Sequence, residues 1–131
     1  MATRKNISSG SPFEPTFGYS RAVRVGNMVF VSGSTAIQPD GTVTGVGDPY
    51  AQAAQALETI EKALVQAGGS MKDVVRTRIF STDLMGHLEA LSKAHSEVFG
   101  EIRPASTGVE IARLAHPDLL IEIEADSVIE E

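Results

Sequence analysis

The stretch RPASTGVEIARL at residues 103–114, followed by LLIEIEA at residues 119–125, carries the clearest structural pattern of the chain. Pro104 and Gly108 punctuate the first segment, which is typical of a loop that leads into a strand. The second segment alternates, with Leu120, Glu122, Glu124 and Asp126 on one side and Leu119, Ile121, Ile123 and Ala125 on the other. The alternation predicts a half-buried antiparallel strand with a solvated acidic face. A second interpretation is that one of these carboxylates lies in a cleft and transfers protons. The pattern alone does not choose between them.

Upstream, the chain predicts a hairpin and a loop. Residues 20–25 and 28–32 are rich in apolar and β-branched side chains, and Gly26-Asn27 between them suits a tight turn that requires positive φ. Residues 28–31 are almost continuously apolar, as in a strand that is covered on both faces. Residues 8–18 contain two prolines and several serines and glycines, and we expect a loop there.

Two helices and one more strand fill the middle of the chain. Asp48 and Pro49 are typical of an N-cap and a first helical position, and Gly68-Gly69 is a typical stop. The spacing predicts a strand over residues 74–81 and a second helix over residues 84–99, with His95 on its apolar stripe. The stripe comprises Leu84, Leu88, Leu91, His95 and Val98. The order indicates an α+β fold, with two helices on one face of a mostly antiparallel or mixed sheet, in a single domain over residues 1–131. Because two helices cover one face only, we expect the other face to need a partner.

Composition narrows the possible partners. The chain of 131 residues and 13.9 kDa is 42% hydrophobic, which is ordinary for a globular protein. Its net charge of −6, with 11 basic residues and no Trp, disfavours nucleic-acid binding, and we expect none. No apolar run reaches membrane-spanning length, and residues 1–7 do not form a secretory signal. Without cysteine there is no disulfide or thiolate chemistry, and we expect a cytoplasmic protein.

No strong catalytic or metal-binding motif is present. His87 and His95 lie eight residues apart, and His116 falls in an expected turn, so no pair has the spacing of metal ligands on a helix. The sequence has no nucleophilic Gly-x-Ser-x-Gly motif and no phosphate-binding glycine loop. We therefore expect no metal and no cofactor.

The segments quoted above nevertheless resemble the closing signature of the Rid (reactive intermediate deaminase) family, also called endoribonuclease L-PSP or YjgF-like proteins. The order is Pro-Ala-x-x-x-Val-Glu-x-Ala-Arg-Leu, a short turn, and then apolar-Glu-Ile-Glu-Ala. Matching motifs lie upstream at residues 17–20, 26–33 and 74–84. The resemblance therefore extends from about Tyr19 to Val128.

The resemblance implies a chorismate-mutase-like fold that assembles as a homotrimer, with small-molecule clefts between neighbouring subunits. It also implies that the cleft is lined by a loop Tyr, a Ser-Gly pair, an Arg of the Pro-Ala-Arg loop and a Glu on the last strand. The corresponding residues here are Tyr19, Ser32 with Gly33, Ser106 and Glu122, with Glu122 as the catalytic acid/base. Thr107, beside Ser106, is a further substrate-binding candidate.

The chain departs from the family pattern at Ser106, where deaminating relatives use Arg to hold the substrate carboxylate. Arg103 precedes this position by three residues, which places it on the opposite face of an extended segment. A bend at Pro104 would let Arg103 take over the anchor, and this alternative stays open. We therefore expect a deaminase-like hydrolase of small imines or enamines other than simple 2-imino acids. The alternative is a non-catalytic small-molecule-binding or chaperone-like member, and whether the protein is an enzyme stays open at this point.

Overall fold

The structure is a computed structural model that describes residues 3–130. Its elements are β1 (Arg4–Ile7), α1 (Phe13–Phe17), β2 (Ala22–Val25), β3 (Met28–Ser34), α2 (Pro49–Gln66), a 3-10 turn η1 (Met71–Asp73), β4 (Val74–Ser81), α3 (Leu84–Phe99), β5 (Ala105–Glu110) and β6 (Ile121–Val128). The ends of the expected domain, residues 1–2 and 131, lie outside the described residues.

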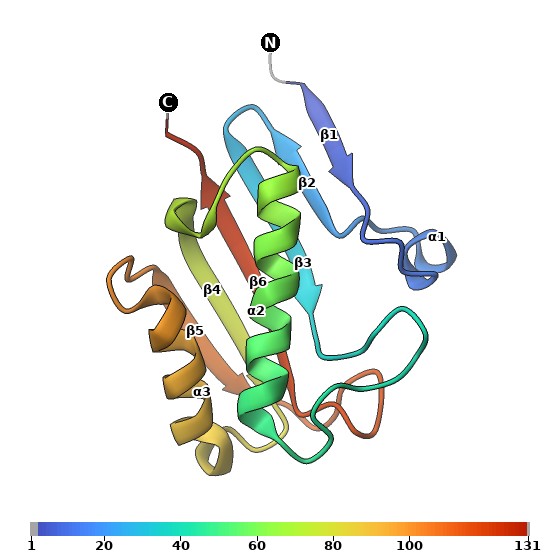
Figure 1. Cartoon of the computed structure of the whole chain (residues 1–131), viewed down its shortest axis with the longest axis vertical. Helices are drawn as coiled ribbons and strands as arrows, with labels where there is room; N and C mark the ends of the chain where they lie inside the picture. Colours follow the sequence, from blue (N-terminus) through green and yellow to red (C-terminus); the bar gives the residue numbers. More distant parts are fainter. Residues whose placement is uncertain (1–2, 131) are drawn as a thin grey trace.

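The strands form one six-stranded sheet in the order β1-β2-β3-β6-β4-β5. The β4–β5 pair is parallel and the other pairs are antiparallel, so the sheet is mixed. The helices α2 and α3 lie side by side across the same face of the sheet, with α2 over β6 and β3 and α3 over β4 and β5 (Figure 1). The architecture confirms the predicted α+β fold with two main helices.

Local chemistry explains why the elements begin and end where they do. Asp48 caps α2 by accepting a hydrogen bond from the backbone N–H of Ala51 (3.0 Å), and Pro49 occupies the first turn. In the hairpin between β2 and β3, Gly26 has a φ of 61°, in the left-handed region that glycine adopts readily. These features confirm the predicted hairpin and the predicted first helix.

The core lies between the sheet and the helices. On β6 the side chains of Ile121, Ile123 and Ala125 are buried beneath α2, which confirms the alternation seen in the sequence. On the opposite face of the sheet, which we call the open face, no helix of residues 3–130 covers the strands. Apolar side chains there, including those of Met28 and Phe30, are each more than 40% exposed.

The structure corrects three local expectations. Residues 8–18 contain the five-residue helix α1 rather than loop alone, and a strand, β1, precedes it at the edge of the sheet. On α3, Leu88 does not join the buried stripe but is 45% exposed. The buried residues of α3 are Leu91, Ala94 and Phe99.

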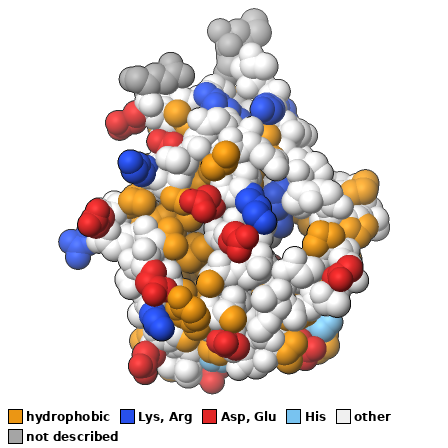
Figure 2. Space-filling model, viewed as in Figure 1, with side chains coloured by type: hydrophobic (Ala, Val, Ile, Leu, Met, Phe, Trp, Pro, Cys, Tyr) orange, Lys and Arg blue, Asp and Glu red, His pale blue; other side chains and the backbone are white. Residues whose placement is uncertain are grey.

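The surface that carries the helices has dispersed charges and two apolar areas, one beside α2 and one at the side where α1 lies (Figure 2). In α1, Phe17 is 85% exposed. Within residues 3–130, no helix combines the length and apolar character that crossing a bilayer requires.

Candidate functional site

Glu122 lies on the open face of β6, opposite Phe80 of β4. Its carboxylate lies against Gly33, in an irregular part of β3 where the register with β6 shifts between Val31 and Ser34. A Cβ atom added at Gly33 would come within 2.7 Å of the Glu122 Oε2 atom and 2.8 Å of Cδ. The absence of a side chain at Gly33 therefore makes room for the carboxylate.

The surroundings of Glu122 favour its protonated form. Burial raises the pKa of Glu122 above its ordinary value of 4.5, and the neighbouring Glu124 carboxylate raises it further. The guanidinium of Arg21 opposes both effects. A carboxyl group whose pKa is raised in this way exchanges a proton closer to neutrality, as a general acid/base must.

The segment before β2 brings Tyr19 and Arg21 to this region, and β3 brings Ser32. The Nη2 atom of Arg21 donates to the Gly33 carbonyl at 2.8 Å. The guanidinium lies 5.6 Å from the centre of the Tyr19 ring, a distance at which cation and ring attract each other. The hydroxyl of Ser32 donates to the Ser20 carbonyl at 2.7 Å, so it fixes the segment that carries Tyr19 and Arg21. Tyr19, Ser32, Gly33 and Glu122, all predicted from sequence, thus belong to one neighbourhood.

Ser106 lies elsewhere in the same chain. It pairs with Thr77 in the β4–β5 ladder, and the Thr77 hydroxyl donates to the Ser106 Oγ atom at 2.8 Å. The Nε2 atom of His95 is 2.9 Å from the same Thr77 oxygen, and burial lowers the pKa of His95. Because His95 belongs to α3, the Ser106 side chain points to the side of the sheet that carries the helices, away from Glu122.

Thr107 lies on the open face but is also remote from Glu122. It pairs with Arg78 on β4, and β4 separates β5 from β6. Two strand spacings amount to about 10 Å. One chain therefore does not bring Ser106 or Thr107 to the Glu122 carboxylate, and a cleft that contains all of them needs a second copy of the chain.

The histidines have local partners within the described residues. The Nδ1 atom of His87 is 2.9 Å from the buried Ser81 hydroxyl, and the Nδ1 atom of His116 accepts from the backbone N–H of Asp118 at 3.0 Å. Among residues 3–130, no group of three His, Asp or Glu side chains could hold a metal ion.

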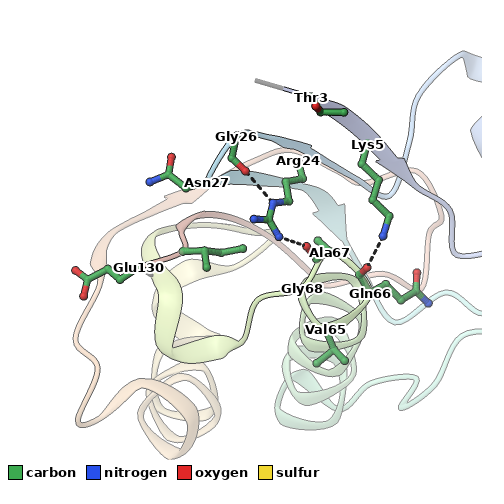
Figure 3. Close-up of a pocket in the computed structure, with 11 residues that line it drawn as sticks. Thr3, Lys5, Arg24, Gly26, Asn27, Val65, Gln66, Ala67, Gly68 and Glu130 are labelled. Atoms are coloured by element: carbon green, nitrogen blue, oxygen red, sulfur yellow. Dashed lines mark hydrogen bonds between the residues drawn. The ribbon is translucent and has the colours of Figure 1, made fainter. Parts of the chain in front are cut away.

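A hollow of about 1070 Å³ lies at the opposite end of β2 (Figure 3). Lys5 and Arg24 line it, and both donate to backbone carbonyls at the end of α2. Lys5 reaches the Gln66 carbonyl at 3.1 Å, and Arg24 reaches the Ala67 carbonyl at 2.7 Å (Figure 3). Since these cations stabilise the helix C-terminus, we assign the hollow a structural role and place the candidate reaction site at Glu122.

Arg21 is the site residue that sequence reasoning missed. Ala22 pairs with the buried Val31 beneath the helices, so Arg21 and Val23 belong to the open face. The available signal was a charged residue two positions after Tyr19 that shares one face of the strand pattern with Val23 and Val25. It could be interpreted only once the faces of the hairpin were known.

The chain belongs to the Rid family: the family model described as Endoribonuclease L-PSP matches residues 10–129. The chain is 39% identical over 117 residues to the 3-aminoacrylate deaminase RutC of Acinetobacter baylyi, which covers 89% of this chain and 90% of the relative. Among solved structures, Rv2704 of Mycobacterium tuberculosis, a member of the YjgF/YER057c/UK114 family, superposes with a TM-score of 0.88 at 46% identity. The match covers 97% of this chain and 100% of that one. YyfA of Yersinia pestis, a Rid protein of unknown function, gives a TM-score of 0.84 at 28% identity, over 97% and 100% of the two chains.

Proposed function

We propose that the protein is a deaminase of small enamines or imines, acting in clefts between the subunits of a homotrimer. The observation that carries this proposal is the Glu122 carboxyl, which lies partly buried against Gly33 with a raised pKa. The relationship to 3-aminoacrylate deaminase RutC supports the reaction class. Tyr19 and the Ser32–Gly33 segment orient the ligand, while Ser106 and Thr107 of a neighbouring subunit line the far side of the cleft.

The proposed chemistry needs one group that both gives and takes protons. Protonated Glu122 donates a proton to the enamine carbon, which gives an iminium ion and leaves Glu122 ionised. Water attacks the iminium carbon, and Glu122 takes a proton from that water. Protonated Glu122 gives that proton to the carbinolamine nitrogen, the C–N bond breaks while the hydroxyl group returns its proton to Glu122, and ammonia and a carbonyl compound leave. Glu122 ends each cycle protonated, and no metal or cofactor enters these steps.

We infer that RNA is not the substrate, although the family description names an endoribonuclease. The chain carries 17 acidic and 11 basic residues. On the open face, Arg78 is paired with Glu124 and Asp126 at 3.2 Å each, so its charge is not free for phosphate. A non-catalytic binding module is the remaining alternative, and it would bind a ligand without releasing ammonia.

Light scattering should give a mass of about 42 kDa, three times the 13.9 kDa of the chain, because a partner must cover the exposed apolar residues of the open face. Phe30→Asp should dissociate this assembly and abolish turnover, since it places a charge among the exposed apolar side chains of the open face. Val65→Asp, on the exposed side of α2, is the matched control and should remain trimeric. A wild-type monomer at all concentrations would contradict both the trimer and the shared cleft.

The position of the carboxylate should decide which substrates are hydrolysed. 3-Aminoacrylate and 2-iminopropanoate are isomers with the same charge, but the carboxylate of the second adjoins the C=N carbon. On the proposal that Ser106 replaces the Arg with which deaminating relatives hold that carboxylate, we expect kcat/KM for 2-iminopropanoate to be at least about tenfold lower. Ammonia release from the two compounds, each generated in the assay, measures the ratio. Equal kcat/KM values would contradict the proposal that Ser106 determines which substrates are hydrolysed. If neither compound released ammonia, the non-catalytic binding module would be favoured.

A further inference from the structure

Arg21 has unused hydrogen-bonding capacity in a buried place. The residue is 9% exposed, and among residues 3–130 its guanidinium has one hydrogen bond, to the Gly33 carbonyl at 2.8 Å. Its Nε atom is buried and has no acceptor within the described residues. Arginine stays charged at every relevant pH, and a buried N–H of a charged group without a partner is costly. Such a group is usually completed by a ligand or by water.

Three other arginines are already engaged or exposed. Arg78 is paired with Glu124 and Asp126, Arg24 caps the end of α2, and Arg103 is exposed with a φ of 54° in a loop. Arg21 differs because it is buried and its Nε atom has no hydrogen-bond acceptor within residues 3–130. Its charge acts on the carboxyl groups of both Glu14 and Glu122. Arg21 is therefore a buried, incompletely paired cation beside the candidate acid/base.

Other groups hold the guanidinium in place. The Gly33 carbonyl fixes it on one side and the Tyr19 ring lies 5.6 Å from it on another. Tyr19 is in turn packed edge-on against Phe17, with ring centres 6.1 Å apart. A guanidinium whose rotamer is fixed before binding loses little conformational entropy when it takes an anion, which makes it a better anchor than a flexible surface side chain.

We propose that Arg21 binds the anionic group of the substrate, so that the pocket takes small carboxylate-bearing enamines or imines. This inference rests on the proposed function for the chemistry at Glu122. Arg21 precedes β2 and is held at Gly33 of β3, and β3 is the neighbour of β6, which carries Glu122. The anion therefore has an anchor within the same chain that does not depend on position 106, which is why Ser106 is compatible with an anionic substrate.

The test uses two inert ligands of the same size, butanoate and butanamide, which differ in charge. Both are titrated by NMR into the assembled wild-type protein, Arg21→Gln and Arg24→Gln. Arg24 is the matched control because it lies three residues further along the chain, on β2, faces the other side of the sheet and carries the same charge. Butanoate should bind at least about tenfold more weakly to Arg21→Gln than to wild type, while Arg24→Gln binds it as wild type does. Butanamide should bind both variants and the wild type equally.

A second measurement needs no variant. The Arg21 Nε–H resonance of the wild-type protein should shift on addition of butanoate and not of butanamide, because the orphaned donor gains a charged acceptor. An unmoved resonance, unchanged butanoate affinity in Arg21→Gln, or no butanoate binding to the wild type would each overturn the proposal. Failure of the proposed function looks different: Arg21-dependent butanoate binding persists, but no enamine or imine releases ammonia.

Discussion

Replacing Glu122 with Gln should lower kcat/KM for 3-aminoacrylate by about a hundredfold or more, the usual contribution of a general acid/base. The amide keeps the size of the side chain and its hydrogen-bonding groups, but it cannot donate a proton to carbon or take one from water. Its neighbours, Gly33 and Phe80, tolerate an isosteric group, so the fold and the assembly should be unchanged. Ammonia release and light scattering measure the two effects separately.

Glu124 provides the control because it lies on the same strand and the same face. It is already engaged with Arg78 at 3.2 Å, and both side chains are about a third or more exposed, so the ion pair contributes little. Glu124→Gln removes the smaller of the two causes that raise the pKa of Glu122 and leaves the burial of Glu122 unchanged, so it should keep most of the activity. If Glu122→Gln retained full turnover, Glu122 would belong to the solvated acidic face that the alternation first suggested.

Glu122→Gln also has a predictable effect on the stability of the fold. Burial raises the pKa of Glu122 above 4.5 in the folded state, so in the interval between the unfolded and folded pKa values the folded chain binds the extra proton. The free energy of unfolding therefore falls as pH rises through that interval. Glu122→Gln removes this dependence and should be at least as stable as wild type at neutral pH, as chemical denaturation at several pH values would measure.

Gly33→Ala should lower kcat/KM by at least about tenfold without unfolding the protein. The new Cβ would lie 2.7 Å from the Glu122 Oε2 atom, so the carboxylate must move. The end of a flexible side chain moves at small cost in stability, but a displaced acid/base no longer reaches the reacting carbon. In Gly33→Ala, kcat/KM should thus fall strongly, while the thermal unfolding temperature should change little.

Gly69→Ala is a suitable control because its added Cβ would also make close side-chain contacts, at 3.2 Å, far from Glu122. It should leave kcat/KM unchanged. Equal activity of Gly33→Ala and wild type would show that Glu122 does not need its present position.

Much of the fold could be predicted because local signals agreed with one another. The Asp48-Pro49 start of α2, the Gly26-Asn27 turn and the alternation of β6 each rest on neighbouring residues. By contrast, β1 contains Arg4 and Lys5 and has no apolar alternation to reveal it. The helix α1 includes a proline and is only five residues long, which is too short for helical periodicity to be detected.

The candidate site was predictable only in part. Glu122 lies on β6, Gly33 and Ser32 lie on the adjacent strand β3, and Tyr19 precedes β2, so their neighbourhood follows from the hairpin and the family resemblance. The orientation of Ser106 depends on the register of the parallel β4–β5 pair, which places it beside Thr77. No local pattern encodes that register, because the two strands are separated by all of α3.

The two edges of the sheet differ in how readily another strand can be added. At one edge, β1 presents the exposed charged side chains of Arg4 and Lys5, a common protection against edge-to-edge aggregation. At the other edge, the strand β5 has the sequence Ala-Ser-Thr-Gly-Val-Glu, is exposed throughout and has one charge, at Glu110. Extension of the sheet by a foreign chain is therefore disfavoured beside β1, and protection against amyloid-like growth has to come from whatever shields β5.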